Sequence, residues 1–320
     1  MRRTFPILVL SAALVACAPP TAFDPNYQPV ASDLGPKNAG IEWWYVSGYL
    51  PESGVAFHWA QFKVNYRGIP YTASHLAVTD LRANTLSFVE KTDGLATYRF
   101  PPLQIGQGDW QLGQGNGHYR LSAGPLDLTL TPLKNPVVHP PGYSGTAETG
   151  RLYYQSITRL ALSGTANGKP ISGLAWMDHQ WGDQTPGRQA LWDWFGLHLS
   201  NDVDLMVYRV KNVEGKVVQL AGSYVDPQGV AREVTNFTAT PRETWTSPTG
   251  RKYVLSWDLK SDQFSLSMNA VRKEQELLSK STFVAYWEGP VAGEGTWGGQ
   301  SVQAEGMGEF VGGALASAPR

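Results

Sequence analysis

The stretch "SITRLALSGTANGKPISGLAWMDHQWGD", residues 156–183, decides the fold. Asn167 and Gly168 lie at its centre, between two runs rich in apolar residues. Asn-Gly between such runs is the strongest short signal for a two-residue type I′ turn. The sequence therefore predicts two long antiparallel strands joined at this turn.

The turn also predicts which residues lie opposite one another. If it sets the register, Ser156 lies opposite His179 and Tyr154 lies opposite Trp181. Successive side chains of a strand point to opposite faces, so Asp178 and His179 point away from each other. The face that carries His179 is the more apolar one, and we expect it to lie inside.

Each member of the adjacent acid–histidine pair has a structural and a functional interpretation. His179 is either a core histidine satisfied by Ser156 or Tyr154, or a group that contacts a ligand. Burial would lower its pKa and keep it neutral. Asp178 has Arg159 as a diagonal neighbour across the hairpin, and a structural ion pair is the favoured interpretation.

The whole chain has the composition of an all-β protein. Its 34 glycines and 22 prolines interrupt short runs of aromatic and β-branched residues. The runs "YVLSWDLK" (253–260) and "FSLSMNAV" (264–271) alternate apolar with polar residues, as strands with one dry face do. The longest stretch without strand signals, residues 133–150, is expected to be a loop.

An internal echo predicts two similar domains. Residues 42–50 and 55–64 share a layout with residues 192–199 and 203–210: an acid among tryptophans, a strand, a turn and another strand. At 320 residues the chain is long enough for two domains, each the size of one antiparallel β-barrel or sandwich. We place them at residues 38–186 and 187–320.

The first copy of this echo contains a candidate ion pair. With residues 51–54 as the turn, Glu42 pairs with Lys63 and Trp44 pairs with Gln61. The structural interpretation is a cross-strand ion pair beneath a tryptophan.

The second copy contains a second candidate acid. With Asn201 and Asp202 as the turn, Asp193 lies diagonal to Tyr208 on an inward face. Trp194 would then lie opposite Arg209 and form a cation–π pair with it.

The amino-terminal segment predicts export and lipid anchoring. Arg2 and Arg3 precede the apolar run of residues 5–16, which is too short for a spanning helix and is typical of a secretory signal. The residues up to Cys17 resemble a bacterial lipobox, in which the cysteine is lipidated. We therefore expect a signal peptide at residues 1–17 and a tether at 18–37. Cys17 is the only cysteine, so it forms no internal disulfide.

Several function classes are disfavoured. The net charge of −1 provides no field that would attract nucleic acid. The chain has no G-x-S-x-G elbow, P-loop or dinucleotide fingerprint. Its six histidines are scattered singly, so we predict neither a metal site nor a cofactor.

The ordered motifs resemble a known family. "EWWYVSGYL", "HLAVTDL", "YYQSITRLALSG", "GLAWMDHQWGD", "WDWFGLHL" and "LMVYRV" resemble, in that order, motifs of the carotenoid 1,2-hydratase (CrtC) and AttH-like family. The resemblance spans about residues 38–312. It implies two tandem lipocalin-like β-barrels, with a cleft or cavity between or within them.

The same resemblance implies several possible activities. Members of the family include hydratases that add water to a polyene double bond, fungal cyclases, secreted proteins described as hydrolases, and lipoproteins encoded beside an ABC-transporter permease. In the hydratases a His-x-Trp element is implicated, and it matches His179 and Trp181 here.

Two hypotheses follow. In the first, the protein is a hydratase-like or hydrolase-like enzyme acting on an apolar substrate. His179 or Asp193 is then the acid, and Tyr208 or Tyr154 positions water or substrate. Aromatic walls would stabilise a carbocation. The residues expected to line the ligand site are Trp44, Trp181, Trp194, Tyr154 and Glu42.

In the second hypothesis the protein is a carrier without catalysis. An aromatic cavity holds an apolar ligand near an ABC-type transporter, and His179, Glu42 and Asp193 are structural. Under both hypotheses we expect a location in the bacterial cell envelope. The protein would be lipid-anchored to the outer membrane and would face the periplasm.

Overall fold

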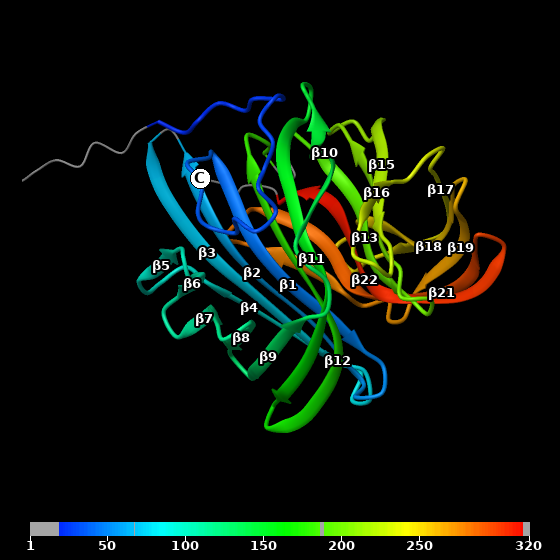
Figure 1. The fold of residues 1–320 in the computed structure, drawn as a ribbon, viewed down its shortest axis with the longest axis horizontal. Coiled ribbons are helices and arrows are strands. Elements are labelled where there is room, and N and C mark those ends of the chain that lie inside the picture. The colour runs from blue at the N-terminus through cyan, green and yellow to red at the C-terminus, as the bar shows by residue number, and fades with distance from the viewer. Residues whose placement is uncertain (1–18, 67, 186–188, 316–320) are drawn as a thin grey trace, which may run out of the picture.

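The computed structural model describes residues 19–66, 68–185 and 189–315, which form twenty-two strands and no helix. The strands build two curled antiparallel sheets (Figure 1), which confirms the predicted all-β fold of two tandem lipocalin-like domains. The first sheet contains β1 (Ile41–Leu50), β2 (Val55–Tyr66), β3 (Ile69–Asp80), β4 (Thr85–Lys91), β5 (Ala96–Arg99), β6 (Gln104–Gln107), β7 (Trp110–Gly115), β8 (His118–Ala123), β9 (Leu126–Pro132), β10 (Val137–Thr146), β11 (Gly150–Ala166) and β12 (Lys169–Gly182). The second contains β13 (Leu191–Leu199), β14 (Asp204–Lys211), β15 (Val217–Val225), β16 (Ala231–Glu233), β17 (Thr238–Thr246), β18 (Lys252–Lys260), β19 (Phe264–Ala270), β20 (Glu276–Ser279), β21 (Val284–Trp297) and β22 (Gln300–Ala314).

The two sheets share one strand order, which the first sheet extends by two further strands, β6 and β5. The first runs β4-β3-β2-β1-β12-β11-β9-β8-β7-β6-β5, and the second runs β16-β15-β14-β13-β22-β21-β19-β18-β17. Off these paths, β10 pairs with β11 and β20 with β21. The internal echo of the sequence therefore reflects a repeated topology. The predicted loop at residues 133–150 is wrong, because β10 lies within it and pairs with β11.

The central strands of each sheet are buried on both faces. On β1, Trp44 and Val46 point into the core enclosed by the first sheet, whereas Trp43 and Tyr45 join an apolar cluster shared with the second sheet. A strand covered on both sides needs no polar face, which explains its nearly continuous apolar sequence. The second sheet encloses a separate core of its own.

The β11–β12 hairpin has the predicted turn but contains a bulge. Asn167 and Gly168 have φ angles of 51° and 72°, as a type I′ turn requires. The predicted pairing holds as far as Leu160 opposite Ala175. Between Leu160 and Ile157 the register shifts by one residue. A bulge places an extra residue in one strand, and no sequence signal marked it.

The bulge reverses the predicted neighbours of the acid and the histidine. Beyond it, Ser156 pairs with Asp178 and Gln155 pairs with His179. Asp178 and His179 still point to opposite faces, as expected, but Tyr154 and Ser156 now accompany Asp178. Two predicted pairs are therefore wrong: Ser156 with His179, and Tyr154 with Trp181.

A buried ionic cluster joins the two sheets. Asp204 is fully buried and contacts Arg159 Nε at 2.9 Å, Lys134 Nζ at 2.8 Å and His198 Nδ1 at 2.8 Å. Burial alone would raise the pKa of Asp204, but the hydrogen bond from His198 and the charges of His198, Arg159 and Lys134 outweigh burial and lower it. The predicted pair of Arg159 with Asp178 is therefore wrong.

The segment before β1 packs against the first sheet. Leu34 O accepts a hydrogen bond from Trp44 Nε1 at 2.8 Å, and Phe23 stacks on Tyr153 with ring centres 4.5 Å apart. From residue 19 onward, the predicted tether is thus tied to the domain. The predicted signal peptide and lipidated Cys17 lie outside the described residues. No helix within the described ranges is long and apolar enough to cross a membrane.

We predict that Asp204→Asn strongly destabilises the protein. The change leaves Arg159 and Lys134 buried without a counter-charge, so the free energy of unfolding should fall by about 3–5 kcal/mol in urea titrations. Because the pKa of Asp204 is lowered in the folded state, its contribution should be lost as pH falls through that lowered value.

The matched control is Asp93→Asn, because Asp93 is exposed. This control should change the free energy of unfolding by no more than about 0.5 kcal/mol. Equal effects of the two substitutions would contradict the assignment of Asp204 as an anchor between the sheets.

Candidate functional site

A cavity of about 630 Å³ lies between the two sheets. The first sheet lines it with residues of β1, β2, β3, β10, β11 and β12, and the second with residues of β13, β14, β21 and β22. It is built from the faces of the central strands that point away from the two closed cores. Each domain therefore supplies about half of one shared site.

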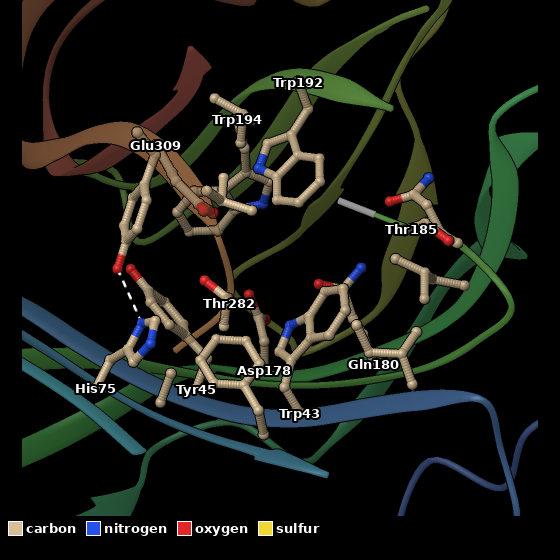
Figure 2. A pocket seen from close by; sticks show the side chains of 18 of the residues that line it. Trp43, Tyr45, His75, Asp178, Gln180, Thr185, Trp192, Trp194, Thr282 and Glu309 are labelled. Atoms are coloured by element: carbon tan, nitrogen blue, oxygen red, sulfur yellow. Dashed lines mark hydrogen bonds between the residues drawn. The ribbon is translucent and has the colours of Figure 1, made fainter. Parts of the chain in front are cut away.

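The walls of the cavity are mainly aromatic. Figure 2 shows Trp43 and Tyr45 from β1 facing Trp192 and Trp194 from β13 across the space. Tyr45 and Trp194 meet edge to face, with ring centres 5.9 Å apart. Among the described residues that line the cavity there is no lysine or arginine. The site therefore suits an apolar ligand, or a positive charge held against aromatic faces.

Asp178 is the buried acid at the centre of one wall. Its Oδ2 accepts a hydrogen bond from Tyr154 Oη at 2.9 Å. Its Oδ1 accepts hydrogen bonds from Trp176 Nε1 at 2.5 Å and from Ser156 Oγ. Burial raises the pKa of Asp178 to about 7, although these three hydrogen bonds act to lower it. A carboxyl of this kind is partly protonated at neutral pH.

The partners of Asp178 are themselves held in place. Tyr154 Oη accepts a hydrogen bond from Trp194 Nε1 at 2.8 Å. Ser156 Oγ lies 2.7 Å from His139 Nε2, and His139 Nδ1 lies 2.5 Å from Ser223 Oγ. Burial lowers the pKa of His139 to about 3, so its ring is neutral. Asp178 thus lies in a hydrogen-bond network that spans both sheets.

Two further carboxyls line the opposite wall: Glu288, which is buried, and Glu309, which is partly buried. They lie directly opposite each other on β21 and β22. Burial raises the pKa of Glu309 to about 7, and burial together with the charge of Glu309 raises the pKa of Glu288. Two neighbouring carboxylates do not both ionise readily, so this pair retains a proton near neutral pH. Glu288 also contacts Tyr45 Oη at 2.6 Å and His58 Nδ1 at 3.0 Å.

A polar cluster forms one end of the cavity. His75 Nε2 lies 2.7 Å from Ser281 Oγ, and its Nδ1 lies 3.0 Å from Tyr286 Oη (Figure 2). Glu90 accepts a hydrogen bond from Ser281 Oγ at 2.6 Å. Burial alone would raise the pKa of Glu90, but its hydrogen bonds from His75, Ser279 and Ser281 lower it. This cluster links β3 and β4 to the turn before β21.

The sequence-predicted site residues divide into two groups. Tyr154, Trp194 and Tyr208 line the cavity. The others are not part of the cavity lining and point toward the closed interiors of the two sheets: His179, Trp181, Trp44, Glu42 and Asp193.

His179 lies in a closed, fully bonded position. Its Nε2 contacts Glu42 Oε1 at 2.8 Å and its Nδ1 contacts Gln155 Nε2 at 3.0 Å. The rings of Trp44 and Trp181 lie on it at 4.7 Å each. Burial lowers the pKa of His179, against the opposing effect of Glu42. The "WMDHQW" motif thus directs its histidine into a tryptophan sandwich and its aspartate into the cavity.

The predicted ion pair of the first sheet is confirmed, with Glu42 opposite Lys63 and an Nζ–Oε2 distance of 2.9 Å. In the second sheet, Asp193 lies opposite Arg209 and binds its guanidinium at 2.7 Å. The predicted placement of Asp193 beside Tyr208 is therefore wrong by one residue. The turn that precedes β14 is one residue longer than expected, because β14 begins at Asp204.

The cation–π prediction is corrected by the same shift. Trp194 lies opposite Tyr208, and the guanidinium of Arg209 lies 4.6 Å from the ring centre of Trp257 instead. Trp194 is therefore left free to point into the cavity.

Sequence reasoning missed Glu288 and Glu309. Each is a single acid in an otherwise apolar strand segment, "YWEGP" and "GEFVG". A related signal, an acid among tryptophans, selects Glu42 and Asp193 in the sequence. It identifies buried acids but does not say which face of the strand they occupy.

Comparison with known proteins identifies the family. The model of the AttH-like family matches residues 24–313. The chain belongs to the AttH-like family. This confirms the family resemblance of the sequence motifs.

Solved structures share the fold across almost the whole chain. An AttH protein from Nitrosomonas europaea has a TM-score of 0.76 at 23% identity, covering 91% of this chain and 99% of that one. Kievitone hydratase from Nectria haematococca has a TM-score of 0.67 at 18% identity, covering 90% and 91%. CghA, solved with Sch210972, has a TM-score of 0.59 at 14% identity, covering 95% and 97%. No curated protein matches the sequence.

We predict that His179→Ala acts on stability. The substitution empties the space between Trp44 and Trp181 and removes a partner of buried Glu42, so the free energy of unfolding should fall by about 2–4 kcal/mol. Urea titration followed by tryptophan fluorescence would measure it. The partly exposed His118→Ala is the control and should have a much smaller effect. Unchanged stability with lost turnover in His179→Ala would instead place His179 in catalysis.

Proposed function

We propose that the protein binds an apolar ligand with a carbon–carbon double bond between its two sheets and adds water to that bond. The observation that carries this proposal is Asp178, a buried carboxyl with a pKa near 7 that faces an aromatic cavity. Proton transfer to carbon needs an acid that still holds its proton at the working pH.

The proposed reaction begins with proton transfer from the Asp178 carboxyl to one alkene carbon. The π electrons form the new C–H bond and the other carbon becomes a cation. Trp43, Trp192 and Trp194 present rings that attract positive charge, and the lining residues described include no competing cation.

Water then completes the addition. A water oxygen bonds to the cationic carbon, and a carboxylate of the Glu288–Glu309 pair accepts the released proton. That proton can return to Asp178 because both carboxyls line the same cavity. The net reaction consumes one alkene and one water and forms one alcohol.

The comparisons support this proposal at the level of the fold. One structural neighbour is named a hydratase, and another was solved with a bound compound. Both have low sequence identity to this chain, so the choice of Asp178 as the acid rests on its own burial and hydrogen bonds.

A carrier without catalysis is the second candidate. The mainly apolar cavity would hold a lipid or polyene in the same way if no proton were transferred. We propose lipidation of Cys17 and a place in the cell envelope for both candidate functions, and contact with an ABC-type permease for the carrier. Mass spectrometry of lipids extracted from the purified protein would identify a retained ligand and thereby the substrate class.

We predict that Asp178→Asn abolishes hydration but retains ligand. Asparagine keeps the shape of the side chain but has no acidic proton, so turnover should fall by about 10²–10⁴-fold. Turnover is measured with extracted bacterial membrane lipids in ¹⁸O-labelled water, by mass spectrometry of products that gain one labelled water. Retention of the extracted lipid by the variant is measured in parallel.

Asp193→Asn is the matched control, because Asp193 lies outside the cavity and pairs with Arg209 and Lys211. The folded control should keep its turnover. Loss of turnover in Asp193→Asn with full activity in Asp178→Asn would reverse the assignment. Ligand retention without labelled product in the wild-type protein would favour the carrier.

We predict a bell-shaped pH–rate profile. The proton acceptor in the Glu288–Glu309 pair is active when ionised, so turnover should decrease at low pH. The proton donor Asp178 is active when protonated, so turnover should fall as pH rises through about 7. The hydrogen bond from Ser156 lowers the pKa of Asp178, so Ser156→Ala should move this fall to higher pH by about one unit. A profile that does not move in Ser156→Ala would remove Asp178 as its source.

A further inference from the structure

The cavity opens through an apolar rim. Ile69, Tyr71 and Phe283 line the cavity and are also exposed, with 67%, 38% and 52% of their surfaces accessible. Tyr71 Oη donates a hydrogen bond to Ser281 O at 3.0 Å, which brings the two sheets together at this point. The rim therefore consists of Ile69 and Tyr71 from β3 and Phe283 from the turn before β21.

Phe283 is held in an unusual backbone conformation. Its φ is +59°, a left-handed region that glycine and asparagine adopt far more easily than a bulky residue. The backbone conformation thus favours glycine or asparagine over phenylalanine at this position. Exposure of the aromatic ring to water adds no stabilisation to the folded state. A phenylalanine at this place makes sense if its ring has an apolar partner outside the chain.

The amino-terminal end of the described chain lies at the same end of the first sheet. Asn38 Nδ2 donates to Pro19 O at 2.9 Å, and Asn65 N donates to Gly40 O at 2.8 Å. Asn65 belongs to the β2–β3 hairpin that carries Ile69. Figure 1 shows the first described residues and the adjoining ends of β2 and β3 at one end of the molecule.

We propose that the rim of Ile69, Tyr71 and Phe283 rests on a lipid bilayer, and that the cavity exchanges its apolar ligand directly with that bilayer. This inference rests on the proposed function of the cavity as an apolar-ligand site. Because the apolar rim is continuous with the apolar cavity, a ligand can move between the bilayer and the cavity without entering water. The predicted lipid on Cys17, two residues before Pro19, would hold the rim at the membrane.

The experiment measures transfer of diphenylhexatriene, a neutral fluorescent polyene, from the loaded full-length protein to vesicles. The vesicles contain phosphatidylethanolamine, phosphatidylglycerol and a lipid-bound quencher. Direct exchange predicts a transfer rate that rises in proportion to vesicle concentration, whereas passage through water gives a rate independent of it. Phe283→Asn with Ile69→Ser should lower the rate about tenfold.

Val213→Ser is the matched control, because Val213 is 55% exposed and does not line the cavity. It should transfer the probe as the wild type does. Asparagine fits the backbone of Phe283, so this variant is expected to fold, and its urea midpoint checks that. A rate independent of vesicle concentration, or equal rates in the rim variant and in Val213→Ser, would overturn the proposal.

Vesicle flotation without any probe separates this inference from the proposed function. Each variant carries Cys17→Ser in this assay, because a lipid on Cys17 would float the protein whatever its rim does. Weaker flotation of the rim variant than of Val213→Ser supports docking even if the protein fails to retain diphenylhexatriene, a failure that counts against the apolar-ligand site alone. Equal flotation of both variants counts against docking, whatever the cavity binds.

Discussion

The bulge in β11 is the constraint on which the site depends. One extra residue between Ile157 and Leu160 exchanges the two faces of β11 in the part of the strand that precedes Ile157. Tyr154 and Ser156 then face the second sheet together with Asp178, and donate hydrogen bonds to it. Thr158 and Arg159, at the bulge itself, both reach Asp204 in the other domain. The bulge therefore places the hydrogen-bond donors of Asp178 and also the residues that bind Asp204 in the other domain.

Burial on both faces of the central strands explains the chemistry between the sheets. Each sheet closes its own apolar core, so the outer faces of β1, β12, β13 and β22 meet each other instead of water. Carboxyls placed there lose solvation, which raises the pKa values of Asp178 and Glu309. The raised pKa values of these carboxyls therefore come from the architecture of the two sheets.

Sequence reasoning reached the fold but only part of the site. Periodicity, turn residues and the internal echo predicted the all-β repeat, the Asn167–Gly168 turn and the Glu42–Lys63 pair, because these depend on local chemistry. The register beyond the turns was wrong by one residue in β11 and in β14, since a bulge or a longer turn leaves no local signal. An error of one residue moves each side chain to the other face. The sequence therefore predicts Tyr154 on the face of His179, whereas the structure has it on the face of Asp178.

The repeated topology gives the cavity two unequal walls. Gln180 lies opposite Trp43 in the first sheet, and Glu309 lies opposite Trp194 at the equivalent place in the second. A neutral amide thus stands where its counterpart is an acid. Two copies of one scaffold have diverged in polarity at matching positions, so a ligand that enters between them meets a gradient. An asymmetric molecule between the sheets meets Asp178 on one side and the Glu288–Glu309 pair on the other, so its two faces are not interchangeable.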